Sequence, residues 1–296
     1  MNKHDAENHK ATNPARHDQI LEAVDALYNA QSTNDLRRQA SSFLEQIRDD
    51  DNAPEQGFIL ASARDQAPPV RYYGLSLISH AIHYRWADFR REQNAAVREW
   101  ILKLANETSD EDPSYVTNKI AELWVETAKR SWAVDWMDMD ERLVSLWEGH
   151  KAQKMMVLNI LETLSEEIFT TEDSVAALRG NDLNRACIDI FIPAQVLTEQ
   201  FPRRENSVDV RYGTDGWISR LSSALHGCAT QTPLEDPHEG FALKLLSAFK
   251  SSVTWIIPKA LIVTQSIERI CSCLAVSSMP VQLVSVPHTN FLLWPR

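Results

Sequence analysis

PVRYYGLSLISHAIHYRW (69–86) and SYVTNKIAELWVETAKRSW (114–132) are the two segments of the chain that decide its fold. In both, apolar side chains recur at steps of three and four residues, which places them on one face of an α-helix. These side chains are Leu75, Ile78, Ile82 and Trp86 in the first segment, and Ile120, Leu123, Trp124, Thr127 and Ala128 in the second. We therefore predict two amphipathic helices, each typical of the second helix of a two-helix repeat.

The composition of the whole chain also favours helices. Only 8 glycines occur in 296 residues, whereas average usage is roughly 7%, so the chain has few residues suited to tight strand turns. Its length reaches the ~250–300 residues at which a single compact core stops growing. The sequence therefore predicts either two domains or a stacked, elongated architecture.

Helical pairs can be traced along the chain, joined by proline, glycine and polar segments. They are expected at 17–30 with 34–50, 53–65 with 70–86, 89–108 with 113–132, 138–150 with 151–169, 174–200 with 216–228, and 237–255 with 258–276. Asn34 and Asp35 supply a candidate cap for the second helix, and Pro258 opens the last one. The predicted fold is an all-α superhelix (solenoid) of about six HEAT-like helical pairs.

The charge of the chain limits the partners that it can bind. The formal net charge is −11, and the acidic excess lies in the first 234 residues. This balance argues against a general polyanion binder and favours basic protein partners. The acidic run RDDDNAPE (48–55) is interpreted as solvated helix ends. Solvated faces are also the default for six basic residues, namely Lys119, Lys129, Arg130, Arg203, Arg204 and Arg211.

Common enzyme signatures do not occur in the sequence. It contains no GxxxxGK[ST] loop, no GxGxxG, no HExxH and no GxSxG, so neither catalytic residues nor a cofactor are expected. His80 and His83 could share a metal, but no acidic or cysteine partner stands at ligand spacing, and ordinary surface histidines are preferred. The acids of VDWMDMDER (134–142) are interpreted as a loop that caps the next helix rather than as a calcium site.

Other features indicate a packed protein in a reducing compartment. Six tryptophans fall between Trp86 and Trp147 and are explained by packing rather than by base stacking. Four scattered cysteines do not suggest a disulfide framework. Pro258 and Lys259 interrupt the most apolar stretch, so no membrane insertion is expected.

Four segments carry a resemblance to a known family. They are VRYYGLSLISHAIHYRW (70–86), YVTNKIAELWVETAKRSWAVDWMDM (115–139), GWISRLSSALHGC (216–228) and WIIPKALIVTQSIERICSCLAVSSMPVQL (255–283). Together they resemble the N-terminal part of an exportin-5-type karyopherin of the importin-β superfamily. The second is similar to the exportin-1-like region shared by several export receptors, and the connector FPRRENSVDVRYG (201–213) is similar to that of fungal relatives.

The resemblance implies a nuclear export receptor that shuttles between nucleus and cytoplasm. Such a receptor would bind Ran GTPase in its GTP form, nucleoporins, and cargo that is either protein or RNA (a hairpin precursor or transfer RNA). The implied organisation is a disordered lead-in (1–16), importin-β N-terminal-like HEAT pairs (17–110), an exportin-1-like HEAT region (111–285) and an atypical tail (286–296). The residues that match the Ran-binding region are Arg71, Asn118, Lys119, Glu122 and Glu126.

Two readings of the chain remain open at this point. The family's chains are several times longer, and the ending VSVPHTNFLLWPR (284–296) departs from the regular helix of the relatives. A truncated or misassembled gene product is the preferred interpretation, with a dedicated short isoform as the alternative. The alternative function is a HEAT-repeat scaffold subunit that holds protein partners without coupling to Ran.

Overall fold

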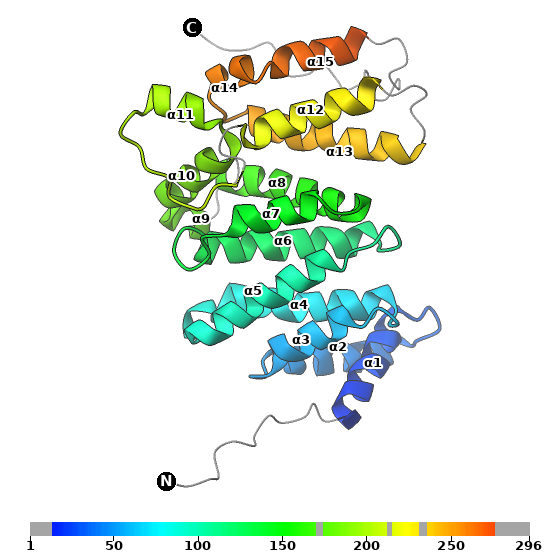
Figure 1. Ribbon diagram of the computed structural model, residues 1–296. Helices are drawn as coiled ribbons and strands as arrows, with labels where there is room; N and C mark the ends of the chain where they lie inside the picture. The colour runs from blue at the N-terminus through cyan, green and yellow to red at the C-terminus, as the bar shows by residue number, and fades with distance from the viewer. Residues whose placement is uncertain (1–13, 170–173, 212–214, 231–235, 276–296) are drawn as a thin grey trace, which may run out of the picture. The chain divides into compact units, whose positions relative to one another are not determined.

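The computed structural model describes residues 14–169, 174–211, 215–230 and 236–275 (Figure 1). Within these ranges it contains fifteen α-helices and one short 3-10 helix, with no β-strand. The all-α fold class predicted from the sequence is confirmed. No helix in the described ranges is both long enough and apolar enough to cross a membrane.

The chain divides into two compact units, and the boundary lies within helix α6, after Glu126. The helices of the first unit are α1 (Pro14–Tyr28), α2 (Asn34–Arg48), α3 (Ala53–Ser62), α4 (Pro68–Arg85), η1 (Trp86–Asp88), α5 (Arg91–Asn106) and the first three turns of α6 (Ser114–Ser131). The second unit contains the end of α6 and α7 (Met139–Trp147), α8 (Lys151–Phe169), α9 (Ser174–Leu178), α10 (Gly180–Phe191), α11 (Ala194–Gln200), α12 (Gly216–Thr230), α13 (Asp236–Val253), α14 (Pro258–Val263) and α15 (Ser266–Ala275).

Paired helices build the core of the first unit. Ile20 and Val24 of α1 are buried with Leu44 and Ile47 of α2, in a cluster that extends to α3 and α4. The helices α3 and α4 pack closely against each other, and a Cβ atom added at Gly74 would lie 2.5 Å from the carbonyl oxygen of Gly57. Glycine at this crossing therefore lets the two backbones touch.

In the second unit, α13 packs against both α8 and α12, and α12 packs against α15 as well (Figure 1). The two helices α7 and α8 form the pair predicted at 138–150 and 151–169. Of the six clustered tryptophans, four are buried, namely Trp124, Trp132, Trp136 and Trp147. Trp100 stacks on Phe58 in the first unit with ring centroids 5.2 Å apart.

Two predicted helices are broken in the structure. The segment predicted as one helix at 174–200 forms α9, α10 and α11, because Arg179 leaves the helical conformation and Ile192 is extended before Pro193. The helix predicted at 258–276 is interrupted at Gln265, whose φ of 52° lies in the left-handed region. The pairing scheme predicted for 174–276 therefore does not hold in detail.

Smaller differences concern helix ends. The side chain of Thr33, not of Asn34 or Asp35, caps α2 by accepting a hydrogen bond from the backbone N–H of Leu36 at 3.2 Å. Helix α1 begins at Pro14, inside the lead-in predicted for 1–16, and the rest of that lead-in lies outside the described residues. The predicted tail, 286–296, lies outside them too.

Candidate protein-interaction surface on α4 and α6

In the first unit, α4 and the first three turns of α6 lie side by side and run in the same direction. Near the start of both helices, the rings of Tyr72 and Tyr115 meet edge to face with centroids 5.5 Å apart. Three turns further on, His83 Nε2 lies 3.6 Å from Glu126 Oε2. The sequence separation between Tyr72 and Tyr115 equals that between His83 and Glu126. Each turn of α4 therefore lies beside the corresponding turn of α6 along this length.

Three of the five residues predicted for Ran binding, namely Asn118, Lys119 and Glu122, are at least partly exposed on this part of α6. Asn118 is exposed. Lys119 Nζ lies 2.5 Å from Glu122 Oε1, and 14% of the Lys119 side chain and 39% of the Glu122 side chain are exposed. The surface is bordered by exposed tyrosine rings at Tyr84 and Tyr115. We call Asn118, Lys119, Glu122, Tyr84 and Tyr115 the α4–α6 surface.

The other two predicted residues, Arg71 and Glu126, lie beneath this surface. Arg71 is only 6% exposed, and its Nε donates to the carbonyl oxygen of Ala61 at 3.1 Å. Its Nη1 lies 2.5 Å from Oδ1 of Asp112. Glu126 has a side chain that is 7% exposed. The structure therefore brings Asn118, Lys119 and Glu122 together on the outside and places Arg71 and Glu126 inside.

Asp112 is a residue of this region that sequence reasoning missed. Its side chain is 2% exposed and receives hydrogen bonds from Arg64, Arg71 and the backbone N–H of Ser109. Burial alone would raise the pKa of this carboxyl group, but the bonds from Arg71, Ser109 and Arg64 outweigh burial and hold the pKa below its ordinary value. In the sequence, Asp112 belongs to the polar segment between the helices predicted at 89–108 and 113–132, which gives no sign of burial.

Several basic residues expected on solvated faces are instead buried or engaged in the second unit. Lys129 has no exposed surface, and its Nζ lies 2.6 Å from Oε2 of Glu167. Arg204 donates to the fully buried carboxylate of Asp189 at 2.7 Å. The prediction of a solvated side chain was wrong at Lys129, which is fully buried beside Glu167. Arg204 is partly exposed and pairs with the buried carboxylate of Asp189.

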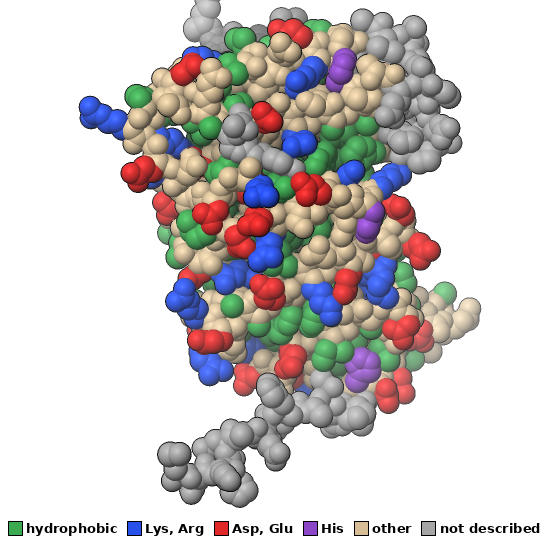
Figure 2. All heavy atoms as spheres, in the orientation of Figure 1, with side chains coloured by type: hydrophobic (Ala, Val, Ile, Leu, Met, Phe, Trp, Pro, Cys, Tyr) green, Lys and Arg blue, Asp and Glu red, His purple; other side chains and the backbone are tan. Residues whose placement is uncertain are grey.

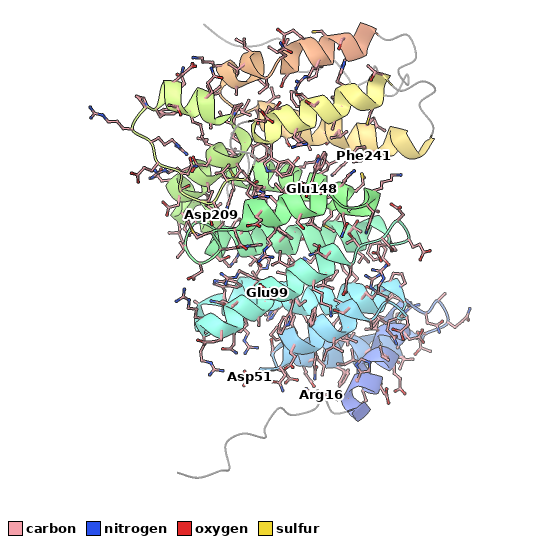
Figure 3. The ribbon with its side chains drawn as sticks, viewed as in Figure 1. Arg16, Asp51, Glu99, Glu148, Asp209 and Phe241 are labelled. Carbon is pink, nitrogen blue, oxygen red and sulfur yellow. The ribbon has the colours of Figure 1, made fainter. Side chains whose placement is uncertain are left out.

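The connector after α11 is likewise held to the unit. Asp189 also accepts hydrogen bonds from the backbone N–H and the hydroxyl group of Ser207, and Asp140 accepts one from the backbone N–H of Arg211 at 2.6 Å. Between them, the N–H of Asp209 donates to the carbonyl oxygen of Met137 in the α6–α7 corner (Figure 3). The stretch 201–211 is therefore anchored at several points rather than free.

The acidic run after α2 is partly used inside the first unit. Asp50 pairs with Arg16 of α1, and Arg85 donates to the carbonyl oxygen of Asp50 at 2.7 Å and to Asp51 Oδ1 at 2.8 Å. Arg16 and Asp51 lie at the same end of that unit (Figure 3). The run thus ties α1 and α4 to the turn before α3, in addition to being solvated.

The two histidines considered for a metal have other neighbours. The ring of His80 packs against Tyr84 with centroids 4.7 Å apart, while His83 faces Glu126. Burial, together with the positive charges of Arg48 and Arg85, lowers the pKa of His80. Across the described ranges, no group of three or more His, Cys, Asp and Glu side chains is arranged to hold a metal ion.

In each unit, acidic and basic side chains of the described residues are interspersed on the face turned to the viewer (Figure 2). Such a face differs from the basic patch by which nucleic-acid binders attract phosphates. It is suited to a protein partner that presents charges of both signs, because charge complementarity chiefly sets specificity and association rate.

Several known proteins that are similar to this chain are named exportins. A family model described as "Exportin 1-like protein" matches residues 113–192, from the start of α6 to the end of α10. Protein MSN5 of Saccharomyces cerevisiae is 25% identical over 289 residues, which cover 93% of this chain and 23% of that protein. Human Exportin-5 is 26% identical over 156 residues, which are 52% of this chain and 13% of the relative.

Exportin-1 of Drosophila melanogaster is 27% identical over 158 residues, or 51% of this chain and 14% of that protein. The chain thus spans less than a quarter of the length of these three relatives. The family match contains four of the five predicted Ran-binding residues, and only Arg71 lies before it. The resemblance predicted from the sequence is confirmed, and the chain is a relative of the exportin-5-type karyopherins, similar to their fungal members.

Proposed function

We propose that this chain is part of a nuclear export receptor that binds Ran in its GTP form through the α4–α6 surface. The observation that carries the proposal is the position of the exportin-1-like match, which begins at the residue before α6. It includes Asn118, Lys119 and Glu122, which the structure holds on the solvent-facing side of that helix. No catalytic step and no cofactor form part of this proposal.

The chemistry of the α4–α6 surface supports recognition of a folded protein. Lys119 and Glu122 offer charges of opposite sign within one helical turn, and Asn118 adds a donor and an acceptor. Exposed tyrosine rings at Tyr84 and Tyr115 supply rigid apolar area at the edges. A partner with matching charges would gain specificity and a faster association from this arrangement.

The direct test is to measure binding of the full chain to Ran loaded with GDP and with a non-hydrolysable GTP analogue. We expect binding to the GTP form to be tighter. Charge reversal by Lys119→Glu should weaken it on the order of tenfold, which corresponds to about 1.4 kcal/mol. Lys151→Glu is the matched control, since Lys151 is an exposed lysine at the start of α8 and the substitution changes the net charge equally. Equal binding of both nucleotide forms would count against the proposal.

We further propose that the receptor carries RNA or protein cargo, meets nucleoporins and shuttles between nucleus and cytoplasm. With the fluorescently tagged chain in cells, blocking GTP hydrolysis by Ran should shift the distribution between the compartments. A scaffold subunit without Ran coupling predicts an unchanged distribution. For cargo, binding of a hairpin RNA and of a transfer RNA should each be measured with and without GTP-loaded Ran. An RNA that is cargo should bind more tightly when GTP-loaded Ran is present, whereas an RNA held only by charge should bind equally in both cases.

A further inference from the structure

The carboxylate of Asp112 joins three segments of the first unit. Arg64, just after α3, reaches its two oxygens at 3.0 and 3.1 Å, and Arg71 of α4 reaches Oδ1 at 2.5 Å. The backbone N–H of Ser109 donates to Oδ2 at 2.9 Å. Arg64 also donates to the carbonyl oxygen of Glu107 at 2.6 Å. A single buried side chain thus fastens the α5–α6 loop to the end of α3 and the start of α4.

This cluster stands directly at the beginning of α6. Asp112 precedes Ser114, the first residue of that helix, by two positions, and Lys119 lies little more than one turn further on. At the far end of the shared length, His83 Nε2 lies 3.6 Å from Glu126 Oε2. Asn118, Lys119 and Glu122 therefore lie between the Asp112 cluster and a second point at which side chains of α4 and α6 approach each other.

We propose that Arg64 and Arg71 are positioning residues, which act through Asp112 to hold α6 in the register that presents Asn118, Lys119 and Glu122 to a protein partner. The partner is the GTP-loaded Ran of the proposed function, on which this inference rests. Neither arginine needs to touch the partner. Arg71, which the family resemblance placed among the contact residues, then contributes from below the surface.

The physical reason is that hydrogen bonds are directional and apolar contacts are not. Val116, Ile120 and Leu123 bury α6 against its neighbours, but the hydrophobic effect scales with area and tolerates small shifts along a helix. Charge-assisted bonds from a planar guanidinium to a carboxylate hold only in a narrow range of geometry. A buried carboxylate is also costly unless such bonds satisfy it, so a shift of α6 would leave Asp112 unsatisfied.

The test begins with hydrogen exchange in the full chain. In Asp112→Asn, an amide group faces two guanidinium groups and loses an acceptor, and we expect the amides of 114–122 to exchange at least tenfold faster. Asp35→Asn is the matched control, because Asp35 pairs with Arg38 on the surface of α2. Arg71→Lys keeps the charge but loses the paired bonds, and should be intermediate. Unchanged exchange in Asp112→Asn would overturn the proposal.

The second readout is a double-mutant cycle on Ran binding. Asp112→Asn alone should weaken binding to GTP-loaded Ran about fivefold, and the loss should largely vanish when Lys119→Ala is already present. A purely structural role would give the same loss in both backgrounds, which would contradict positioning. If Asp112→Asn does not fold, Arg64→Gln takes its place, since 38% of the Arg64 side chain is exposed.

The two proposals can fail separately. A wild-type chain that binds neither form of Ran overturns the proposed function, and with it the role of the arginines in Ran binding. Exchange at 114–122 then decides whether the cluster holds α6 in place. If Lys119→Glu loses binding to GTP-loaded Ran but Asp112→Asn keeps it unaltered, the proposed Ran binding is supported and the positioning role of Arg64 and Arg71 is refuted.

Discussion

The indole Nε1 of Trp217 donates a hydrogen bond to Oδ1 of Asp140 at 2.6 Å, and both side chains are fully buried. The second oxygen of the same carboxylate accepts the backbone N–H of Arg211. Asp140 thus links α7, the connector and α12 within the second unit. Burial of a carboxylate is tolerated when donors surround it in this way. Loss of the bond from Trp217 would therefore destabilise the fold, because the buried carboxylate of Asp140 would lack one of its donors.

Replacing Asp140 by asparagine should destabilise the second unit by about 1–3 kcal/mol, because the indole N–H of Trp217 or the backbone N–H of Arg211 then faces a neutral amide instead of a carboxylate. Urea unfolding followed by tryptophan fluorescence measures the change, since five of the nine tryptophans lie in the described part of this unit, namely Trp132, Trp136, Trp147, Trp217 and Trp255. Asp138→Asn is the control, because Asp138 lies two positions away and pairs with Arg142 at the surface. Its effect should stay within about 0.5 kcal/mol. Similar losses in the two variants would show that burial of Asp140 is not the cause.

The crossing of α3 and α4 gives a second prediction. In Gly74→Ala the new methyl group would lie 2.5 Å from the carbonyl oxygen of Gly57 and 2.7 Å from the backbone nitrogen of Ala61. Both neighbours are backbone atoms that cannot rotate away, so we expect a loss of about 1–3 kcal/mol.

Gly227→Ala in α12 is the matched control for this substitution. Apart from the neighbouring backbone of α12 itself, no atom lies within 4 Å of the added Cβ at that position, and alanine is favoured over glycine in a helix by about 0.5–1 kcal/mol. Thermal unfolding should therefore show a lower Tm for Gly74→Ala and an unchanged or higher Tm for Gly227→Ala. A neutral Gly74→Ala would mean that the two helices can move apart at little cost.

The sequence predicts the positions of those helices whose apolar side chains recur with a clear helical period. The apolar period of α4 and α6 located both helices, since a buried stripe requires steps of three and four residues. The break at Gln265 was missed because a glutamine with positive φ has no sequence signal. Asp112, Asp140 and Asp189 were missed for a different reason. Their main side-chain partners come from distant positions, and the sequence around an acidic residue, whether in a loop or in a helix, gives no sign that it will be buried.

For the site, the family resemblance predicted five residues and the apolar period predicted the two helices that carry them, but neither could separate exposed from buried residues. Arg71 and Lys119 look alike in sequence, as basic residues near the start of amphipathic helices. Only the position of the α5–α6 loop in the structure shows that Arg71 forms an ion pair with Asp112. Burial is decided by neighbours in space, which a single sequence does not report.

Cysteine reactivity should differ sharply between two positions of the second unit. Burial raises the pKa of the Cys187 thiol well above its usual range, whereas Cys271 is exposed on α15. Because the thiolate is the reacting species, alkylation near neutral pH should modify Cys271 at least a hundredfold faster than Cys187. Peptide mapping after brief treatment with iodoacetamide measures both rates. In denaturant the two should react alike, and comparable rates in the native chain would contradict the burial of Cys187.

The last prediction concerns pH and follows from Asp112. Its carboxyl group has a lowered pKa in the folded chain, so it favours the folded state whenever it is ionised. This contribution is fully present above the pKa of an unfolded aspartate, about 3.9, and is lost as the pH falls below that value and through the folded pKa. The unfolding free energy of wild type should therefore exceed that of Asp112→Asn by an amount that is constant from pH 5 to 7 and shrinks below about pH 4. Urea unfolding of both chains across this range measures the difference, with Asp35→Asn as the control for an exposed carboxylate. A gap between wild type and Asp112→Asn that persists unchanged at about pH 2 would show that the variant acts through shape rather than through the charge that Arg64 and Arg71 hold in place.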